Sequence, residues 1–143
     1  MAGLGWGLPM ALGAAVAKPE APIFVISGDG GFAHAWSELE CCKREGIDVV
    51  CVVLNYEMLG YQYHAEHAKF GNHTTASCNL YPVDYAKLAE ACGLKGMTVR
   101  DPKDLDKVLE EAFHSEGTVV INMITDDRSV PPVNALKSQI PQF

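Results

Sequence analysis

A buried strand that ends in a glycine-rich turn is the feature that most constrains this fold. Residues 23–26 (Ile-Phe-Val-Ile) are apolar on both faces, as in a central strand of a parallel sheet. Residues 27–32 (Ser-Gly-Asp-Gly-Gly-Phe) form the turn, and the pattern of residues 35–45 predicts a helix after it. Glycines let the backbone approach a ligand, a helix N-terminus can bind an anion, and Asp29 can hold a hard cation. The stretch suggests a metal-bridged phosphate, although aspartate and glycine are also ordinary turn residues.

Strands and helices alternate along the rest of the chain. Strands are expected at residues 22–27, 49–54, 96–99 and 118–124. Helices are expected at residues 10–17, 35–45 and 84–92, and in a segment that begins with an Asp101-Pro102 cap and ends at Gly117. This alternation predicts an α/β fold, with a parallel sheet, helices on both faces and right-handed crossovers.

Two loops are expected to share one rim of this sheet. Residues 27–32 follow the first strand and residues 55–60 follow the second, and open parallel sheets bind ligands beyond the carboxyl ends of their strands. Residues 61–81 show no clear period and are expected to form an irregular active-site segment. The domain is expected to span residues 1–124, with a proline-containing tail at residues 125–143.

The composition limits the classes of function. With 143 residues, 48% hydrophobic and 20% charged, the chain suits one globular domain with a sizeable core. A formal charge of -7 without a Lys/Arg cluster argues against a nucleic-acid surface. There is no unbroken run of about 18 apolar residues, so no membrane span is expected, and residues 1–17 lack the basic start of a signal peptide. The five cysteines include no C-x-x-C pair and suit reduced thiols, so we expect a cytoplasmic protein.

Several motifs occur in an order that resembles one enzyme family. They are Gly3-Leu4-Gly5-Trp6-Gly7-Leu8-Pro9, Gly28-Asp29-Gly30-Gly31-Phe32, Glu38-Leu39, Val53-Leu54-Asn55 and Leu59-Gly60. Together they resemble the C-terminal thiamine-diphosphate-binding domain of the acetolactate synthase and 2-oxo-acid decarboxylase family. The resemblance covers roughly residues 2–125 and implies a flavodoxin-like three-layer domain. It is much more specific than the Gly-Asp-Gly triplet alone, because several elements recur at compatible spacing.

The resemblance also implies a cofactor site. The carboxylate of Asp29 and the carbonyl of Met58 would bind Mg²⁺, and backbone N–H groups of the two loops would hold diphosphate oxygens. Leu4 would support the bent cofactor from below, with ordinary core packing as the alternative. The implied cofactor-binding residues are Gly3, Leu4, Gly28, Asp29, Gly30, Gly31, Phe32, Asn55, Leu59 and Gly60. The implied metal-binding residues are Asp29, Asn55 and Met58.

Tyr56 departs from the family pattern. The family has paired asparagines here, and Tyr56 replaces the second, which is a Mg²⁺ ligand. A neutral phenol, with a pKa of about 10, is a poor ligand for an ion that demands octahedral oxygen geometry. Asn55 could turn in as a substitute, a water could fill the position, the chain could bind the cofactor poorly, or a single-base variant or an error could explain Tyr56. Our hypothesis is that Tyr56 weakens the binding of Mg²⁺ and cofactor.

The implied activity is decarboxylation or carboligation of 2-oxo acids with thiamine diphosphate and Mg²⁺. In the family the activating glutamate lies on a pyrimidine-binding domain of a neighbouring subunit, so no catalytic residue is expected in this chain. The expected partners are that domain, a second copy in a homo-oligomer and a small 2-oxo acid, without nucleic acid or membrane. The chain starts on a glycine-rich turn, so we expect a fragment or a subunit of a split enzyme, inert alone. A phosphate- or nucleotide-binding regulatory module and a scaffold domain are the open alternatives.

Several other polar side chains can be interpreted either as functional or as ordinary surface residues. The sequence holds Glu66 near His64, His67 and His73, but zinc prefers closed nitrogen and sulfur sets, so histidines facing substrate or solvent are favoured. We expect Tyr61 and Gln62 on the substrate side.

Some aromatic and apolar positions also need an assignment. Trp36 and Cys42 are expected in the core, and His34 either caps the next helix or faces the cleft. Apolar Leu4, Trp6 and Met10 suggest a surface that is normally covered, so we expect self-association or instability when the domain is alone.

Overall fold

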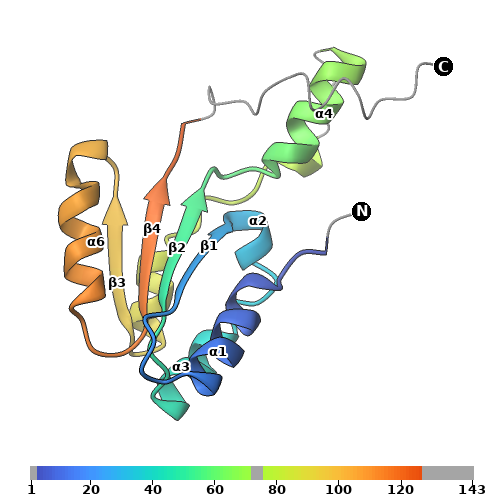
Figure 1. The fold of residues 1–143 in the computed structure, drawn as a ribbon. Helices are drawn as coiled ribbons and strands as arrows, with labels where there is room; N and C mark the ends of the chain where they lie inside the picture. The colour runs from blue at the N-terminus through green and yellow to red at the C-terminus, as the bar shows by residue number, and fades with distance from the viewer. Residues whose placement is uncertain (1–2, 72–75, 127–143) are drawn as a thin grey trace.

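The computed structural model describes residues 3–71 and 76–126 and has a parallel sheet at its centre (Figure 1). The sheet has four strands in the order β1-β2-β4-β3. All neighbouring strands pair in parallel. The strands are β1 (Phe24–Gly28), β2 (Val50–Asn55), β3 (Lys95–Val99) and β4 (Val119–Ile124). The prediction of a parallel α/β fold is confirmed.

Helices cover both faces of this sheet. They are α1 (Gly7–Ala17), α2 (Asp29–Phe32), α3 (Glu38–Glu45), α4 (Gly60–Phe70), α5 (Tyr85–Ala91) and α6 (Leu105–Phe113). Two short 3₁₀ turns, η1 (Ala76–Cys78) and η2 (Pro102–Asp104), lie between them. Helices α1, α3 and α5 pack on one face and α6 packs on the other, which gives three layers.

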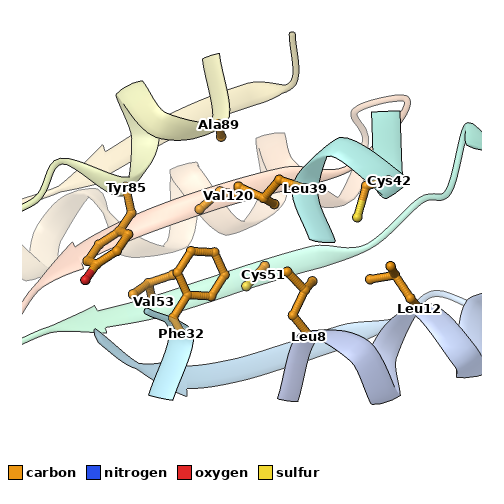
Figure 2. Packing of buried hydrophobic residues seen from close by; sticks show 10 residues of the cluster. All are labelled: Leu8, Leu12, Phe32, Leu39, Cys42, Cys51, Val53, Tyr85, Ala89 and Val120. Atoms are coloured by element: carbon orange, nitrogen blue, oxygen red, sulfur yellow. The ribbon is translucent and has the colours of Figure 1, made fainter. Parts of the chain in front are cut away.

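The main core lies on the face that carries α1, α3 and α5. Phe32 from α2 packs edge-on against Tyr85 from α5, with ring centroids 5.3 Å apart. Figure 2 shows these rings beside Val53 and Cys51 of β2, in the same cluster as Leu39 of α3. Each large apolar side chain buried in this way contributes about 1.5–3 kcal/mol. This packing holds the start of α2, and with it the glycine-rich turn, against the sheet.

The opposite face is covered less completely. Ala112 of α6 is buried against Val52 and Ile121, but α6 lies over the β3–β4 side. The ring of Phe113 stacks on Phe24 of β1 at 5.7 Å between centroids. Ile26, farther along β1, is 58% exposed. Strand β1 is therefore an edge strand with an open apolar side among the described residues.

Side-chain caps fix where several helices begin. Both Asp84 and Asp101 accept hydrogen bonds from backbone N–H groups at the next turn, at 3.0–3.2 Å. Such a cap contributes about 1 kcal/mol. Gly46 ends α3 with φ of 63°, a left-handed value that glycine adopts without strain. The sequence-based assignments of the Asp101 and Gly46 caps are confirmed.

Three local predictions are wrong. Residues 60–70 form the helix α4, although an irregular segment was expected, and α4 has no apolar stripe by which the pattern could reveal it. The glycine-rich turn already contains the short helix α2, and α3 begins at Glu38. Trp36, expected in the core, lies before α3 and is 43% exposed, whereas Cys42 is buried.

The remaining expectations concern the membrane and the tail. None of the helices among the described residues is long and apolar enough to cross a membrane. Residues 127–143, most of the expected tail, lie outside the described part of the chain.

Candidate functional site

Asp29 lies at the end of β1, where it begins α2, and is only 4% exposed. Gly28 before it has an extended backbone (φ -71°, ψ 156°), so the chain turns sharply from strand to helix at this point. The carboxylate is held by backbone N–H groups. Oδ1 accepts from Gly30 at 2.7 Å, and Oδ2 accepts from Tyr56 at 2.9 Å and from Met58 at 3.3 Å. One buried carboxylate therefore joins the loops after β1 and β2, and the prediction that they share a rim is confirmed.

Close packing locks the two loops together. A β-carbon on Gly30 would lie 2.6 Å from Cδ2 of Leu59, so the backbone of α2 can approach the second loop only without a side chain there. The second loop is fixed from its far side as well. The N–H of Leu59 donates to the carbonyl of Cys78 at 2.7 Å, and the N–H of Leu80 donates to that of Glu57 at 2.9 Å. The rim is a pre-formed structure built from three chain segments.

The phenol of Tyr56 is directed to helix α4. Its hydroxyl lies 3.0 Å from Nε2 of His64, and its ring covers Gly60 at the start of α4. The structure thus places the backbone N–H of Tyr56 on Asp29 and the phenol on His64. This contact ties α4 to the loop after β2.

Asn55 is directed into the sheet. Its side-chain nitrogen donates to Oδ1 of Asn122 at 3.0 Å and to the carbonyl of Val83 at 2.9 Å, and Asn55 is 3% exposed. The role of Asn55 as a metal ligand stays a prediction. In this structure its amide nitrogen is used by β4 and by the segment before α5.

The glycine-rich N-terminal segment reaches the same rim. Gly5 has a left-handed φ of 84°, and a β-carbon there would lie 2.9 Å from Cβ of His34. His34 thus backs the turn that carries Leu4. Leu4 itself is 54% exposed, which excludes ordinary core packing for it within the described residues. A bulky apolar side chain is therefore exposed on a turn that packs against the residues just after α2.

A polar hollow of about 560 Å³ opens where β2 and β4 end. The residues that line it are Tyr56, Glu57, Met58, Asn79, Leu80, Thr125 and Asp126. Tyr61 and Gln62, expected on the substrate side, lie on α4, where Gln62 bonds to Glu66. His64 and His67 share α4 as a metal cluster would require, but His73 lies outside the described residues. Within those residues no three His, Cys, Asp or Glu side chains converge on a metal position.

Tyr85 lies beneath the turn. Its hydroxyl is 3.5 Å from the backbone carbonyl of Asp29. Burial, and then the negative charge of Asp29, raise the pKa of this phenol. Tyr85 therefore stays neutral and supports the turn by packing against Phe32.

Comparison with known proteins shows the family of the chain. The sequence model of one family, described as the thiamine pyrophosphate enzyme C-terminal TPP binding domain, matches residues 1–123. The chain belongs to this family. Thiamine pyrophosphate, also called thiamine diphosphate, is the cofactor of the family, whose enzymes also use Mg²⁺ through this domain. The resemblance inferred from the motifs is confirmed.

Several relatives match nearly the whole chain. The acetolactate synthase catalytic subunit of Saccharomyces cerevisiae is 35% identical over 98% of this chain and 20% of its own length. A thiamine pyrophosphate-containing protein of Bacillus subtilis, YdaP, is 34% identical over 93% of this chain and 22% of its own.

Among solved structures, the thiamine diphosphate-dependent 4-hydroxybenzoylformate decarboxylase of Rhodococcus jostii has a TM-score of 0.77. It is 25% identical over 87% of this chain and 24% of that one. The chain thus spans about a fifth to a quarter of the length of these proteins.

The carboxylate of Asp29 fits a hard cation. Mg²⁺ prefers oxygen ligands such as the Asp29 carboxylate. Within the described residues, Oδ2 accepts two N–H groups and Oδ1 accepts one, so Oδ1 keeps a lone pair for a cation.

The sequence alone did not reveal the role of Asn122 or the contact between Tyr56 and His64. A lone amide in the apolar run of β4 was the available signal, because a buried amide needs partners.

Proposed function

We propose that this chain supplies the diphosphate- and Mg²⁺-binding half of the active site of an acetolactate synthase-like enzyme. Its substrates would be 2-oxo acids. The observation that carries the proposal is the buried carboxylate of Asp29, fixed by N–H groups from two strand-end loops. A carboxylate this deeply buried and this well oriented suits a hard cation better than a role in an ordinary turn.

In the proposed site each element of this chain has a separate task. Asp29 would hold Mg²⁺ through Oδ1, and the Met58 carbonyl would be a second ligand. The N–H groups of Gly31 and Gly60 would bind diphosphate oxygens, because those of Gly30 and Leu59 already donate to Asp29 and to the carbonyl of Cys78. Exposed Leu4 would support the cofactor rings. When bound, thiamine diphosphate supplies the nucleophilic carbon that attacks a 2-oxo acid so that CO₂ can leave.

The rest of the active site would come from elsewhere. We expect the activating glutamate on a pyrimidine-binding domain, either in a longer form of this protein or in a partner subunit. The chain spans about a fifth of its acetolactate synthase relative, which agrees with this expectation. We therefore propose that this chain is inert alone, that it works in a homo-oligomer, and that it is located in the cytoplasm.

The two kinds of relative carry out different reactions on their substrates. The yeast relative is an acetolactate synthase, and the Rhodococcus structure is a 4-hydroxybenzoylformate decarboxylase. The decarboxylase's name states a 2-oxo acid as its substrate, whereas the synthase's name states a product. We therefore propose the substrate class and leave the acceptor to the domains that complete the site.

Thermal unfolding of the full 143-residue chain tests the proposal. A ligand that binds only the native state must raise the melting temperature. We expect thiamine diphosphate and Mg²⁺ together to raise it, and each alone to raise it much less. An equal rise with ADP and Mg²⁺ would favour a nucleotide-binding module instead. A flat response to all ligands would favour a scaffold domain.

A further inference from the structure

A pair of amide side chains joins the ends of β2 and β4 inside the sheet. Nδ2 of Asn55 donates to Oδ1 of Asn122 at 3.0 Å, and Asn122 is 1% exposed. Nδ2 of Asn122 donates in turn to Oδ1 of Asp84 at 3.4 Å, the same carboxylate that caps α5. A connected chain of polar groups therefore links two strands and a helix.

Asn122 interrupts an otherwise apolar strand. Its neighbours in β4, Ile121 and Val120, are completely buried, and an amide in such surroundings costs free energy unless it is hydrogen-bonded. An apolar residue of similar size would avoid this cost. The amide therefore calls for an explanation beyond packing, and its partner Asn55 supplies one.

Asn55 is held from more than one direction. Its backbone carbonyl accepts from the N–H of Thr125 at 3.0 Å and from Oγ1 of Thr125 at 3.2 Å. Its side chain is held by Asn122 and by the carbonyl of Val83. The next residue is Tyr56, whose N–H donates to Oδ2 of Asp29. The amide pair thus lies one residue from the contact that orients the carboxylate.

We propose that Asn122 is a positioning residue for Asp29 and acts through Asn55. Asn122 fixes the side chain of Asn55, which fixes the end of β2, which in turn places the N–H groups of Tyr56 and Met58 on Asp29. The inference rests on the proposed function as far as Mg²⁺ binding is concerned. Mutating a group that orients a metal ligand typically costs about 10- to 100-fold in metal affinity or activity.

The same geometry gives Asn55 a role different from direct ligation. Turning its amide toward a cation at Asp29 would break the hydrogen bonds to Asn122 and Val83. Asn55 therefore serves the site by fixing the loop after β2.

Two substitutions at Asn122 and one matched control test this inference in the full 143-residue chain. Asn122→Leu removes the acceptor of Asn55, and Asn122→Ser leaves a hydroxyl one bond short of it with less risk to folding. Thr118→Val is the control. Thr118 is equally buried, at 1% exposed, and lies just before the start of β4, where its Oγ1 donates to the carbonyl of Ile47.

Amide hydrogen exchange measures the positioning directly and needs no ligand. We expect exchange at Tyr56 and Met58 to become about tenfold faster in both Asn122 variants, the change expected from loss of one buried hydrogen bond. In Thr118→Val the same two amides should exchange as in the unchanged chain. Equal exchange at Tyr56 and Met58 in all four proteins would overturn the positioning role.

Titration with Mg²⁺ at saturating thiamine diphosphate, followed by the melting temperature, measures the consequence. Both Asn122 variants should need about 10- to 100-fold more Mg²⁺ for half-saturation, whereas Thr118→Val should melt earlier without that change. Asn122 variants that behave like the control would overturn the inference. An unchanged chain that binds nothing would overturn the proposed function and the metal-binding part of the inference, while hydrogen exchange would still decide the positioning role.

Discussion

The ring of Tyr56 lies over Gly60 so closely that a β-carbon on Gly60 would be 2.9 Å from Cε1 of the ring. The hydroxyl of the same ring is 3.0 Å from His64, one helical turn farther along α4. The Tyr56 side chain is therefore clamped between the start of α4 and its second turn. Tyr56, the residue that departs from the family pattern, is therefore well packed in the rim.

We expect Gly60→Ala to destabilise the chain by up to about 2 kcal/mol. Alanine gains about 1 kcal/mol of helix propensity, but overpacking against a held ring costs about 1–3 kcal/mol, so the clash outweighs the gain. When Tyr56→Asn removes the ring, the same glycine substitution should become neutral or stabilising. Urea unfolding of the four proteins in this cycle measures the change, and a stabilising Gly60→Ala in the unchanged background would contradict it.

Two substitutions of Tyr56 distinguish the effect of the missing amide ligand on Mg²⁺ affinity from the effect of the phenol hydroxyl. Tyr56→Asn should lower the Mg²⁺ concentration for half-saturation about tenfold, because an amide oxygen is a better ligand than a neutral phenol. Tyr56→Phe should leave that concentration nearly unchanged, because the hydroxyl is directed to His64. Calorimetric titration at fixed thiamine diphosphate provides the measurement. Equal Mg²⁺ affinities for Tyr56→Asn and the unchanged chain would contradict the hypothesis that Tyr56 weakens the binding of Mg²⁺ and cofactor.

Cys51 should make the chain less stable at alkaline pH. Burial in the sheet, and then neighbouring Cys42, raise the pKa of its thiol from 9.0 to about 12. The unfolded chain therefore loses this proton first, so the stabilisation is complete below pH 9 and is lost as the pH rises toward 12. The free energy of unfolding should fall by up to about 1.4 kcal/mol per pH unit in this window.

Unfolding in urea at pH 8 and at pH 10.5 isolates this effect if Cys51→Ala is measured beside the unchanged chain. Lysines and tyrosines titrate in both proteins, so only the difference between them reports on Cys51. The stability difference between the two proteins should shrink as the pH rises. A difference that stays constant over this range would show that the thiol does not contribute.

The sheet and most helices could be predicted from the sequence because burial dictates them. The apolar run at residues 49–54 is typical of a buried strand, and Gly46 marks the end of α3. The last helix was expected to end at Gly117, but α6 already ends at Phe113. Helix α4 could not be predicted, because its residues form no apolar stripe. It is positioned instead by contacts such as Tyr56 with His64, which depend on a loop that sequence periodicity does not describe.

The candidate site could be predicted only in part, for a similar reason. Asp29 was identified because a glycine turn after a strand is a local pattern. The partner of Asn55 is Asn122, 67 residues away, and only the strand order brings the two together. The family resemblance assigned Asn55 to the metal, and this role stays a prediction, but only the fold shows that the Asn55 amide donates to Asn122 of β4.

The open side of β1 should make the isolated chain self-associate. Ile26 is 58% exposed on an edge strand, and Trp6 just before α1 and Met10 within α1 are exposed as well. Ile26→Lys places a charge on this edge and should shift the chain toward monomer. Light scattering over a range of concentrations measures the effect. A monodisperse monomer without any substitution would count against the prediction.

Calorimetric titration of thiamine diphosphate, with and without Mg²⁺, into the unchanged chain and Asp29→Asn tests the central claim most directly. Asparagine keeps the size of the side chain but removes the charge that would hold the cation. The account predicts Mg²⁺-dependent binding to the unchanged chain and loss of that dependence in Asp29→Asn. Binding that is equally tight in both proteins, or that does not depend on Mg²⁺, would contradict it.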